Sequence, residues 1–207
     1  MPEFGGLALG LILLMAATLA ALVLPSLLDA PVWRDAAAGA YTVARYAAIS
    51  SLVNVVLGFL VPQAIALGML WIAFIKANRG DRYLWNAVMI VSAGIVAELF
   101  DVSIAAPRHR IFAPSLGTTG ANVWIVSGTI AYAALHFTLS SAGYRRLYAS
   151  LAVAVMVCLY VVPVFLGGIS WLTLLCSLAV SLGIWAIGVW IAEQVGFDPY
   201  AADDEAI

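Results

Sequence analysis

Long runs of apolar residues, separated by short polar segments, dominate this chain. Each run is about 20 residues or longer, which is the length an α-helix needs to cross the hydrocarbon core of a bilayer. The pattern therefore predicts six transmembrane helices, over residues 6–28, 49–75, 83–106, 120–140, 147–166 and 171–194. Pro62 and Gln63 lie near the middle of the second run and predict a kink or a tilt there.

Residues 30–46, between the first two runs, have a different pattern. Aromatic and basic side chains stand there among small apolar residues: Trp33, Arg34, Tyr41, Arg45 and Tyr46. Aromatic rings favour the depth of the lipid headgroups, and arginines favour the phosphate layer. We therefore expect an interfacial helix after the first span.

The composition agrees with an all-α integral membrane protein. Hydrophobic residues make up 65% of the 207 residues and charged residues only 10%, and the mean hydropathy is +1.07. The hydrophobic fraction and the mean hydropathy lie well above those of a soluble domain, and the charged fraction lies well below. Six spans leave no room for a separate soluble domain, so we expect one transmembrane domain over residues 1–197. Residues 198–207 are acidic and are expected to form a short disordered tail.

The charge and the counts of single residue types argue against several functions. A net charge of -2 shows no basic excess, so we expect no nucleic-acid partner. Two histidines are too few for a site that needs three, and we expect neither a metal nor another cofactor. Cys158 and Cys176 lie inside apolar runs, where we expect small buried side chains rather than a disulfide.

The positions of the nine basic residues predict the orientation of the spans. Five of them flank two loops on the side of both termini: Lys76, Arg79, Arg82, Arg145 and Arg146. The other four lie on the opposite side: Arg34, Arg45, Arg108 and Arg110. Because cytoplasmic loops carry an excess of lysine and arginine, we expect both termini in the cytoplasm and Arg108 facing the periplasm or exterior. The expected location is a bacterial inner membrane.

The segment after the third span concentrates charge in a chain that has little of it. Residues 101–117 read DVSIAAPRHRIFAPSLG and contain Asp101, Arg108, His109 and Arg110. Glu98 lies three residues before Asp101, so the two carboxylates share one face of the helix. Charged groups near hydrocarbon are costly unless they are paired or hydrated, so they mark places where something is bound, moved or held together.

Two interpretations of these charges stay open. In one, the carboxylates neutralise the guanidiniums and tie the third helix to the following loop. In the other, Arg108 and Arg110 form a bidentate site for phosphate or carboxylate, beside a hydroxyl-rich turn at the N-terminus of the fourth span. Carboxylates turned toward a hydrated pocket would support the second. The candidate ligand-binding residues are Glu98, Asp101, Arg108, His109, Arg110, Ser115 and Thr118.

Six spans, an interfacial helix, and motif-bearing loops after the third and fifth spans resemble the type 2 phosphatidic acid phosphatase superfamily of lipid phosphatases. The family's first motif, Lys-x6-Arg-Pro, aligns with Asp101, six residues, Arg108 and His109. Its second motif, Pro-Ser-Gly-His, aligns with residues 114–117, and the aromatic-Leu-Gly step of its third aligns with residues 165–167. The resemblance implies a phosphate site built from these loops.

The departures from the family's pattern fall on its catalytic residues. The resemblance implies a nucleophilic histidine at residues 169–170 and a second histidine, the acid for the leaving group, at residues 116–117, but neither is present. Asp101 replaces the phosphate-binding lysine, and only Arg108 is retained. A serine without a nearby base is a poor substitute nucleophile. We therefore expect the fold to be kept and the phosphatase chemistry to be lost.

The sequence thus predicts a non-catalytic, lipid-phosphatase-like membrane protein. We expect the pocket around Arg108 to bind a membrane lipid, such as an anionic lipid or an isoprenoid phosphate, or to hold a partner protein in a membrane complex. One alternative is an enzyme that acts on phospholipid or polyprenyl phosphate with altered chemistry. Another is a small transporter that uses Glu98 and Asp101 as intramembrane carboxylates.

Overall fold

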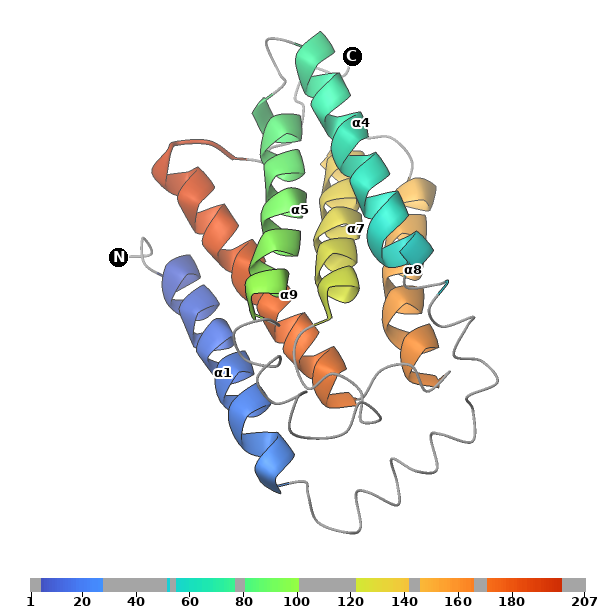
Figure 1. Ribbon diagram of the computed structural model, residues 1–207. Helices are drawn as coiled ribbons and strands as arrows, with labels where there is room; N and C mark the ends of the chain where they lie inside the picture. Colours follow the sequence, from blue (N-terminus) through green and yellow to red (C-terminus); the bar gives the residue numbers. More distant parts are fainter. Residues whose placement is uncertain are drawn as a thin grey trace.

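The computed structural model describes residues 5–27, 52, 55–76, 81–100, 122–141, 146–165 and 171–198. The elements within these residues are all helical: α1 (Gly5–Leu27), the π-helix η2 (Val56–Leu60), α4 (Val61–Ile75), α5 (Asp81–Phe100), α7 (Val123–Ser141), α8 (Arg146–Phe165) and α9 (Trp171–Gln194). The π-helix continues directly into α4, and each helical rod runs antiparallel to the one before it in the chain (Figure 1).

The predicted all-α fold is confirmed for the described residues. Four helical segments there are long and apolar enough to cross a membrane: Val56–Ile75, Asp81–Phe100, Val123–Ser140 and Thr173–Gln194. The predicted bounds of the last span, 171–194, coincide with those of α9, and those of the first span differ from α1 by one residue at each end. The interfacial helix predicted over 30–46 and the tail after Asp198 lie outside the described residues.

A kink or a tilt was predicted at Pro62, and the structure has a π-helical turn, η2, directly before it. The N–H of Val61 donates to the carbonyl of Val56, five residues back, and Pro62 has no N–H to donate. The carbonyl of Leu57 therefore receives no hydrogen bond from either residue. The hydroxyl of Tyr132 in α7 donates to it instead, at 2.7 Å. This bond attaches the π-helical turn to α7.

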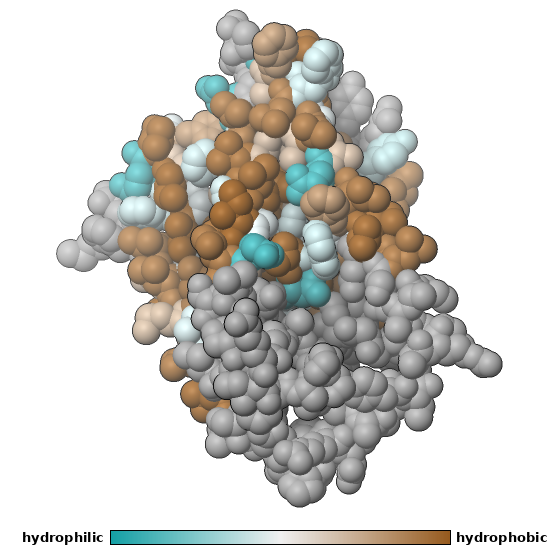
Figure 2. Space-filling view, viewed as in Figure 1, coloured by the Kyte–Doolittle hydropathy of each residue, from teal (hydrophilic) through white to brown (hydrophobic). Residues whose placement is uncertain are grey.

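Helix α7 lies at the centre of the fold, surrounded by α4, α5, α8 and α9 (Figure 1). Its side chains are buried through several turns, for example Ile125, Ile130 and Ala134. The outer helices instead expose large apolar side chains, such as Phe74 of α4 and Leu151 of α8. Apolar residues dominate the described part of the face in Figure 2. Such outer faces are suited to contact with hydrocarbon.

Glycines bring two pairs of helices close together. A Cβ built on Gly10 of α1 would lie 2.8 Å from the carbonyl oxygen of Gly183 in α9. A Cβ built on Gly58 of η2 would lie 2.5 Å from the Cβ of Trp124 in α7. Membrane helices gain little from hydrophobic burial against one another, so close packing at small residues is a main source of their association.

Buried polar groups add connections between the helices. The hydroxyls of Thr129 in α7 and Tyr160 in α8 are 2.6 Å apart, and the backbone N–H of Asn122 donates to the hydroxyl of Ser177 in α9 at 2.8 Å. Interhelical bonds of this kind contribute about 0.6–2 kcal/mol each in a membrane. They hold α7, α8 and α9 in register.

The two cysteines occupy different environments. Both are free thiols, and Cys176 is buried, as expected. The prediction was wrong for Cys158, which is exposed. Helix α8 packs through the face that carries Ala152 and Leu159, and residue 158 falls on another face of the helix.

Candidate functional site

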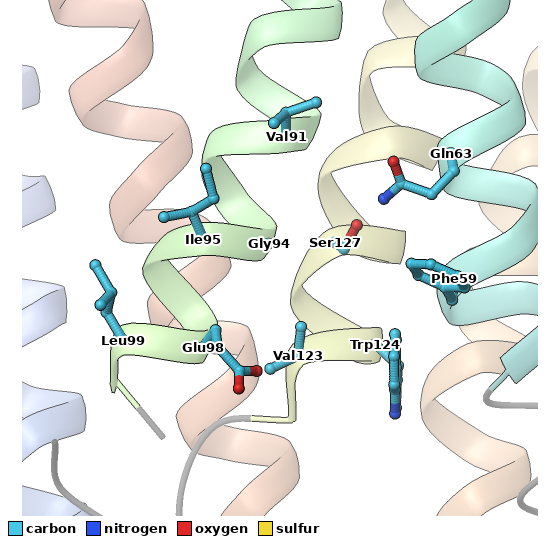
Figure 3. Close-up of a pocket in the computed structure, with 10 residues that line it drawn as sticks. All are labelled: Phe59, Gln63, Val91, Gly94, Ile95, Glu98, Leu99, Val123, Trp124 and Ser127. Carbon is cyan, nitrogen blue, oxygen red and sulfur yellow. The ribbon is translucent and has the colours of Figure 1, made fainter. Parts of the chain in front are cut away.

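A groove lies between α4, α5 and α7, beside the π-helical turn (Figure 3). Its volume of about 440 Å³ falls within the range of about 300–1,000 Å³ typical of small-molecule sites. The lining residues come from all three helices and from η2: Phe59, Gln63, Val91, Gly94, Ile95, Glu98, Leu99, Val123, Trp124 and Ser127. Seven of these ten are apolar or glycine, and three are polar: Gln63, Glu98 and Ser127.

The walls of the groove suit a hydrocarbon chain. On α5, Val91, Ile95 and Leu99 recur at every fourth position and are exposed, so they form one apolar stripe. On the other side, the rings of Phe59 and Trp124 pack edge to face with centroids 5.1 Å apart. The close contact between Gly58 and Trp124 sets the spacing of η2 and α7 and thereby fixes this aromatic pair.

Gly94 widens the groove. It lies between the stripe on α5 and the polar residues, and no atom lies within 4 Å of a Cβ built on it. A larger side chain at this position would project into open space. The volume of the groove therefore depends on the glycine.

Ser127 differs from the hydroxyl residues around it. Six others in the described helices donate to the carbonyl four residues earlier: Thr18, Ser92, Thr129, Ser150, Ser177 and Ser181. Ser127 is only 2% exposed, yet its Oγ has no hydrogen-bond partner among the described residues. A buried polar group without a partner costs about 1–3 kcal/mol. Such a group on the wall of a groove marks a place where a partner from outside would be stabilising.

Gln63 supplies a second polar group near Ser127. Figure 3 shows the amide of Gln63 and the hydroxyl of Ser127 turned toward one another, from α4 and α7. No hydrogen bond joins them, because the Ser127 Oγ is without a partner in the described part of the chain. Two facing polar groups that do not bond directly are commonly bridged by a third group, such as water or a ligand atom.

Glu98 is the charged member of the site. It is exposed and lies two residues before the last residue of α5, so it lies at the end of the span rather than in its middle. Its carboxylate points toward that end in Figure 3. No ion pair between Glu98 and another described residue is present. The groove thus combines an acceptor-only carboxylate, an amide and a hydroxyl with apolar walls, an arrangement that can bind an amphiphile.

Of the seven site residues predicted from the sequence, Glu98 lines the groove. The other six lie outside the described residues: Asp101, Arg108, His109, Arg110, Ser115 and Thr118. The segment that contains them connects Leu99 and Phe100 at the end of α5 with Asn122 and Val123 at the start of α7. Leu99 and Val123 both line the groove. The described residues that flank the charged segment on both sides therefore lie at the groove.

Four residues of the groove were not predicted from the sequence: Phe59, Gly94, Trp124 and Ser127. Gln63 was predicted only as part of a kink or a tilt. Gln63 carried a usable signal, since a polar side chain in the middle of a span usually has a functional or structural partner. Ser127 carried none, because a serine that bonds its own helix and one that does not look the same in a sequence.

Comparison with known proteins adds no relative. The chain matches no protein-family model, no curated protein and no solved structure. The resemblance to lipid phosphatases therefore stays a prediction from a few motif residues. The function is therefore inferred from the groove itself.

Proposed function

We propose that this protein binds the headgroup region of a membrane lipid in the groove between α4, α5 and α7. The observation that carries the proposal is the buried Ser127 hydroxyl, which lines the groove and has no partner among the described residues. Two further features support it. Three polar groups and an aromatic pair line the groove, and the stripe on α5 runs along it as apolar surface. A lipid likewise combines polar groups with an apolar chain.

The same proposal places the protein in a bacterial inner membrane with six spans. Helices α1 and α8 contain 23 and 20 residues, and at 1.5 Å per residue each reaches the roughly 30 Å of a hydrocarbon core. Together with the four segments that are long and apolar enough by themselves, they make six antiparallel spans. An even number of spans puts both termini on one side, which the basic loops assign to the cytoplasm.

This orientation predicts the outcome of labelling in intact cells. In a background without Cys158 and Cys176, Ala113→Cys is expected to react with a membrane-impermeant maleimide added from outside. Gly80→Cys is expected to react only after the membrane is permeabilised, because its loop carries the basic residues that stay in the cytoplasm. Labelling of position 80 in intact cells, with position 113 protected, would refute the orientation.

The charged residues of the segment after α5 are included in the proposed site. Because the described residues on either side of this segment, Leu99 and Val123, line the groove, Arg108 and Arg110 are proposed to contribute to binding there, with Asp101 as the counterion of Arg108. The loss of both family histidines supports a binding role rather than phosphatase chemistry. We propose on these grounds that the protein holds a lipid without hydrolysing it.

Filling the groove is the direct experiment. Gly94→Leu is expected to place its side chain in the groove without meeting the protein, since nothing lies within 4 Å of a Cβ there. Folding should be unaffected or slightly improved, because leucine favours a helix over glycine by about 0.5–1 kcal/mol. The number of lipids retained through purification in mild detergent, counted by native mass spectrometry, should fall by at least one per protein.

Gly68→Leu is the matched control. Gly68 also lies within a span, in α4, and a Cβ there likewise meets nothing within 4 Å, but the residue does not line the groove. This variant should retain as much lipid as the unaltered protein. Equal lipid retention in the Gly94→Leu and Gly68→Leu proteins would contradict the proposed function.

A further inference from the structure

The three polar residues of the groove lie at different depths. Counted from the end of the span at the groove's mouth, Glu98 lies two residues into α5, Ser127 four residues into α7 and Gln63 seven residues into the rod formed by η2 and α4. At 1.5 Å per residue, these positions correspond to depths of about 3, 6 and 10 Å. Figure 3 shows the same order, with Glu98 at one end and Gln63 farthest from it. A bound lipid would meet the carboxylate first and the other two groups deeper.

Glu98, the outermost of the three polar groups, favours a cationic headgroup. An ionised carboxylate only accepts hydrogen bonds, and its strongest partners are positively charged N–H donors. Glu98 is exposed and forms no ion pair with a described residue. Trp124 lies across the groove from it in Figure 3, beyond Val123, and an indole ring also attracts cations. A headgroup that carries the phosphate charge but no cation would instead be repelled.

Ser127 and Gln63, the two deeper polar groups, favour a hydrogen-bond acceptor on the lipid. Ser127 offers a hydroxyl donor that is not used within the described residues, and Gln63 offers two N–H donors on its amide. Their side chains face the same space in Figure 3. An ester carbonyl oxygen between them would accept a hydrogen bond from each. Ile95 lies at the same level on α5, and beyond it Val91 presents only apolar surface to an acyl chain.

We infer that the lipid in the groove is one with a primary ammonium headgroup, of the phosphatidylethanolamine type. The inference rests on the proposed function and names the ligand class for the same groove. The ammonium group pairs with Glu98, a glycerol ester carbonyl accepts from Ser127 and Gln63, and an acyl chain follows the stripe on α5. A phosphatidylcholine headgroup carries a cation but has no N–H donor, and a phosphatidylglycerol headgroup carries no cation.

The test is a competition among three lipids with identical acyl chains. Full-length protein, purified free of lipid, is titrated with phosphatidylethanolamine, phosphatidylcholine and phosphatidylglycerol, and native mass spectrometry reports the bound fraction of each. We expect phosphatidylethanolamine to bind about fivefold more tightly than phosphatidylglycerol, with phosphatidylcholine between them. Glu98→Gln should reduce this preference to less than about twofold, and Glu98→Asp should keep most of it.

Glu193→Gln is the control for loss of a carboxylate. Glu193 is exposed on α9 and does not line the groove, so the preference should be unchanged. Equal binding of the three lipids, tighter binding of phosphatidylglycerol, or a preference that survives Glu98→Gln would overturn the ammonium inference. In each of these cases the proposed function stands as long as Gly94→Leu still removes lipid. Binding that Gly94→Leu does not change would overturn the proposed function and the inference together.

Discussion

Replacing Gly58 by leucine is expected to destabilise the protein by about 3 kcal/mol. A Cβ on Gly58 would lie 2.5 Å from the Cβ of Trp124 and 2.9 Å from its carbonyl oxygen. A backbone carbonyl cannot move without its helix, so η2 and α7 would have to separate. The separation would also strain the hydrogen bond from Tyr132 to Leu57. The apparent free energy of unfolding, measured by denaturant titration in mixed micelles, reports the loss.

Gly94→Leu is the matched variant for this measurement. Gly58 contacts the helix that forms one wall of the groove and Gly94 lies on the opposite wall, but only Gly58 has close neighbours. Gly58→Leu should lower stability and also reduce lipid retention, because the aromatic pair is displaced. Gly94→Leu should reduce lipid retention while stability is kept. If the Gly58→Leu protein were as stable as the Gly94→Leu protein, η2 and α7 would not be packed closely at Gly58.

Replacing Gly10 by leucine is expected to have an effect of similar size at a different contact. A Cβ on Gly10 would lie 2.5 Å from Cγ1 of Ile187 and 2.8 Å from the carbonyl oxygen of Gly183. The isoleucine can turn away, but the carbonyl belongs to the backbone of α9. We expect α1 to lose its packing on α9, at a cost of about 3 kcal/mol. Denaturant titration measures this loss as well.

Gly5→Leu provides the comparison within the same helix. No atom lies within 4 Å of a Cβ on Gly5, so leucine there should leave stability nearly unchanged. Lipid retention in the groove should persist in whatever fraction of the Gly10→Leu protein is folded, because Gly10 does not line the groove. A Gly10→Leu protein as stable as Gly5→Leu would show that α1 and α9 do not pack through these glycines.

The spans were predictable because hydrophobic length is a strong signal in a membrane protein. The backbone must satisfy its own hydrogen bonds in hydrocarbon, so a long apolar run becomes a helix whatever its neighbours are. The bounds of α9 followed directly from the sequence. A kink or a tilt was predicted near Pro62, since proline lacks an N–H, but the π-helical turn before it was not. The hydrogen bond from Tyr132 to Leu57 in this turn joins residues 75 apart in the chain, and no local pattern reveals such a partner.

The groove was not predictable, because it is formed by residues far apart in the sequence. Its residues come from η2, α4, α5 and α7, and each of them reads as an ordinary member of an apolar run. Glu98 was identified because a carboxylate near hydrocarbon stands out in any sequence. Ser127 became a candidate only when its hydroxyl was seen to lack the bond that six other hydroxyls make. The predicted roles of Arg108 and Arg110 stay predictions.

The central claim is that a lipid occupies the groove, and fluorescence of Trp124 tests it most directly. Trp124 lines the groove, and its signal among the seven tryptophans is the difference between the unaltered protein and Trp124→Phe. Lipid-free protein in detergent is titrated with phosphatidylethanolamine that carries brominated acyl chains, which quench a nearby indole. We predict that quenching of the Trp124 signal saturates near one lipid per protein and is absent in Gly94→Leu. Quenching that grows without saturation, or is equal in the two proteins, would contradict the account.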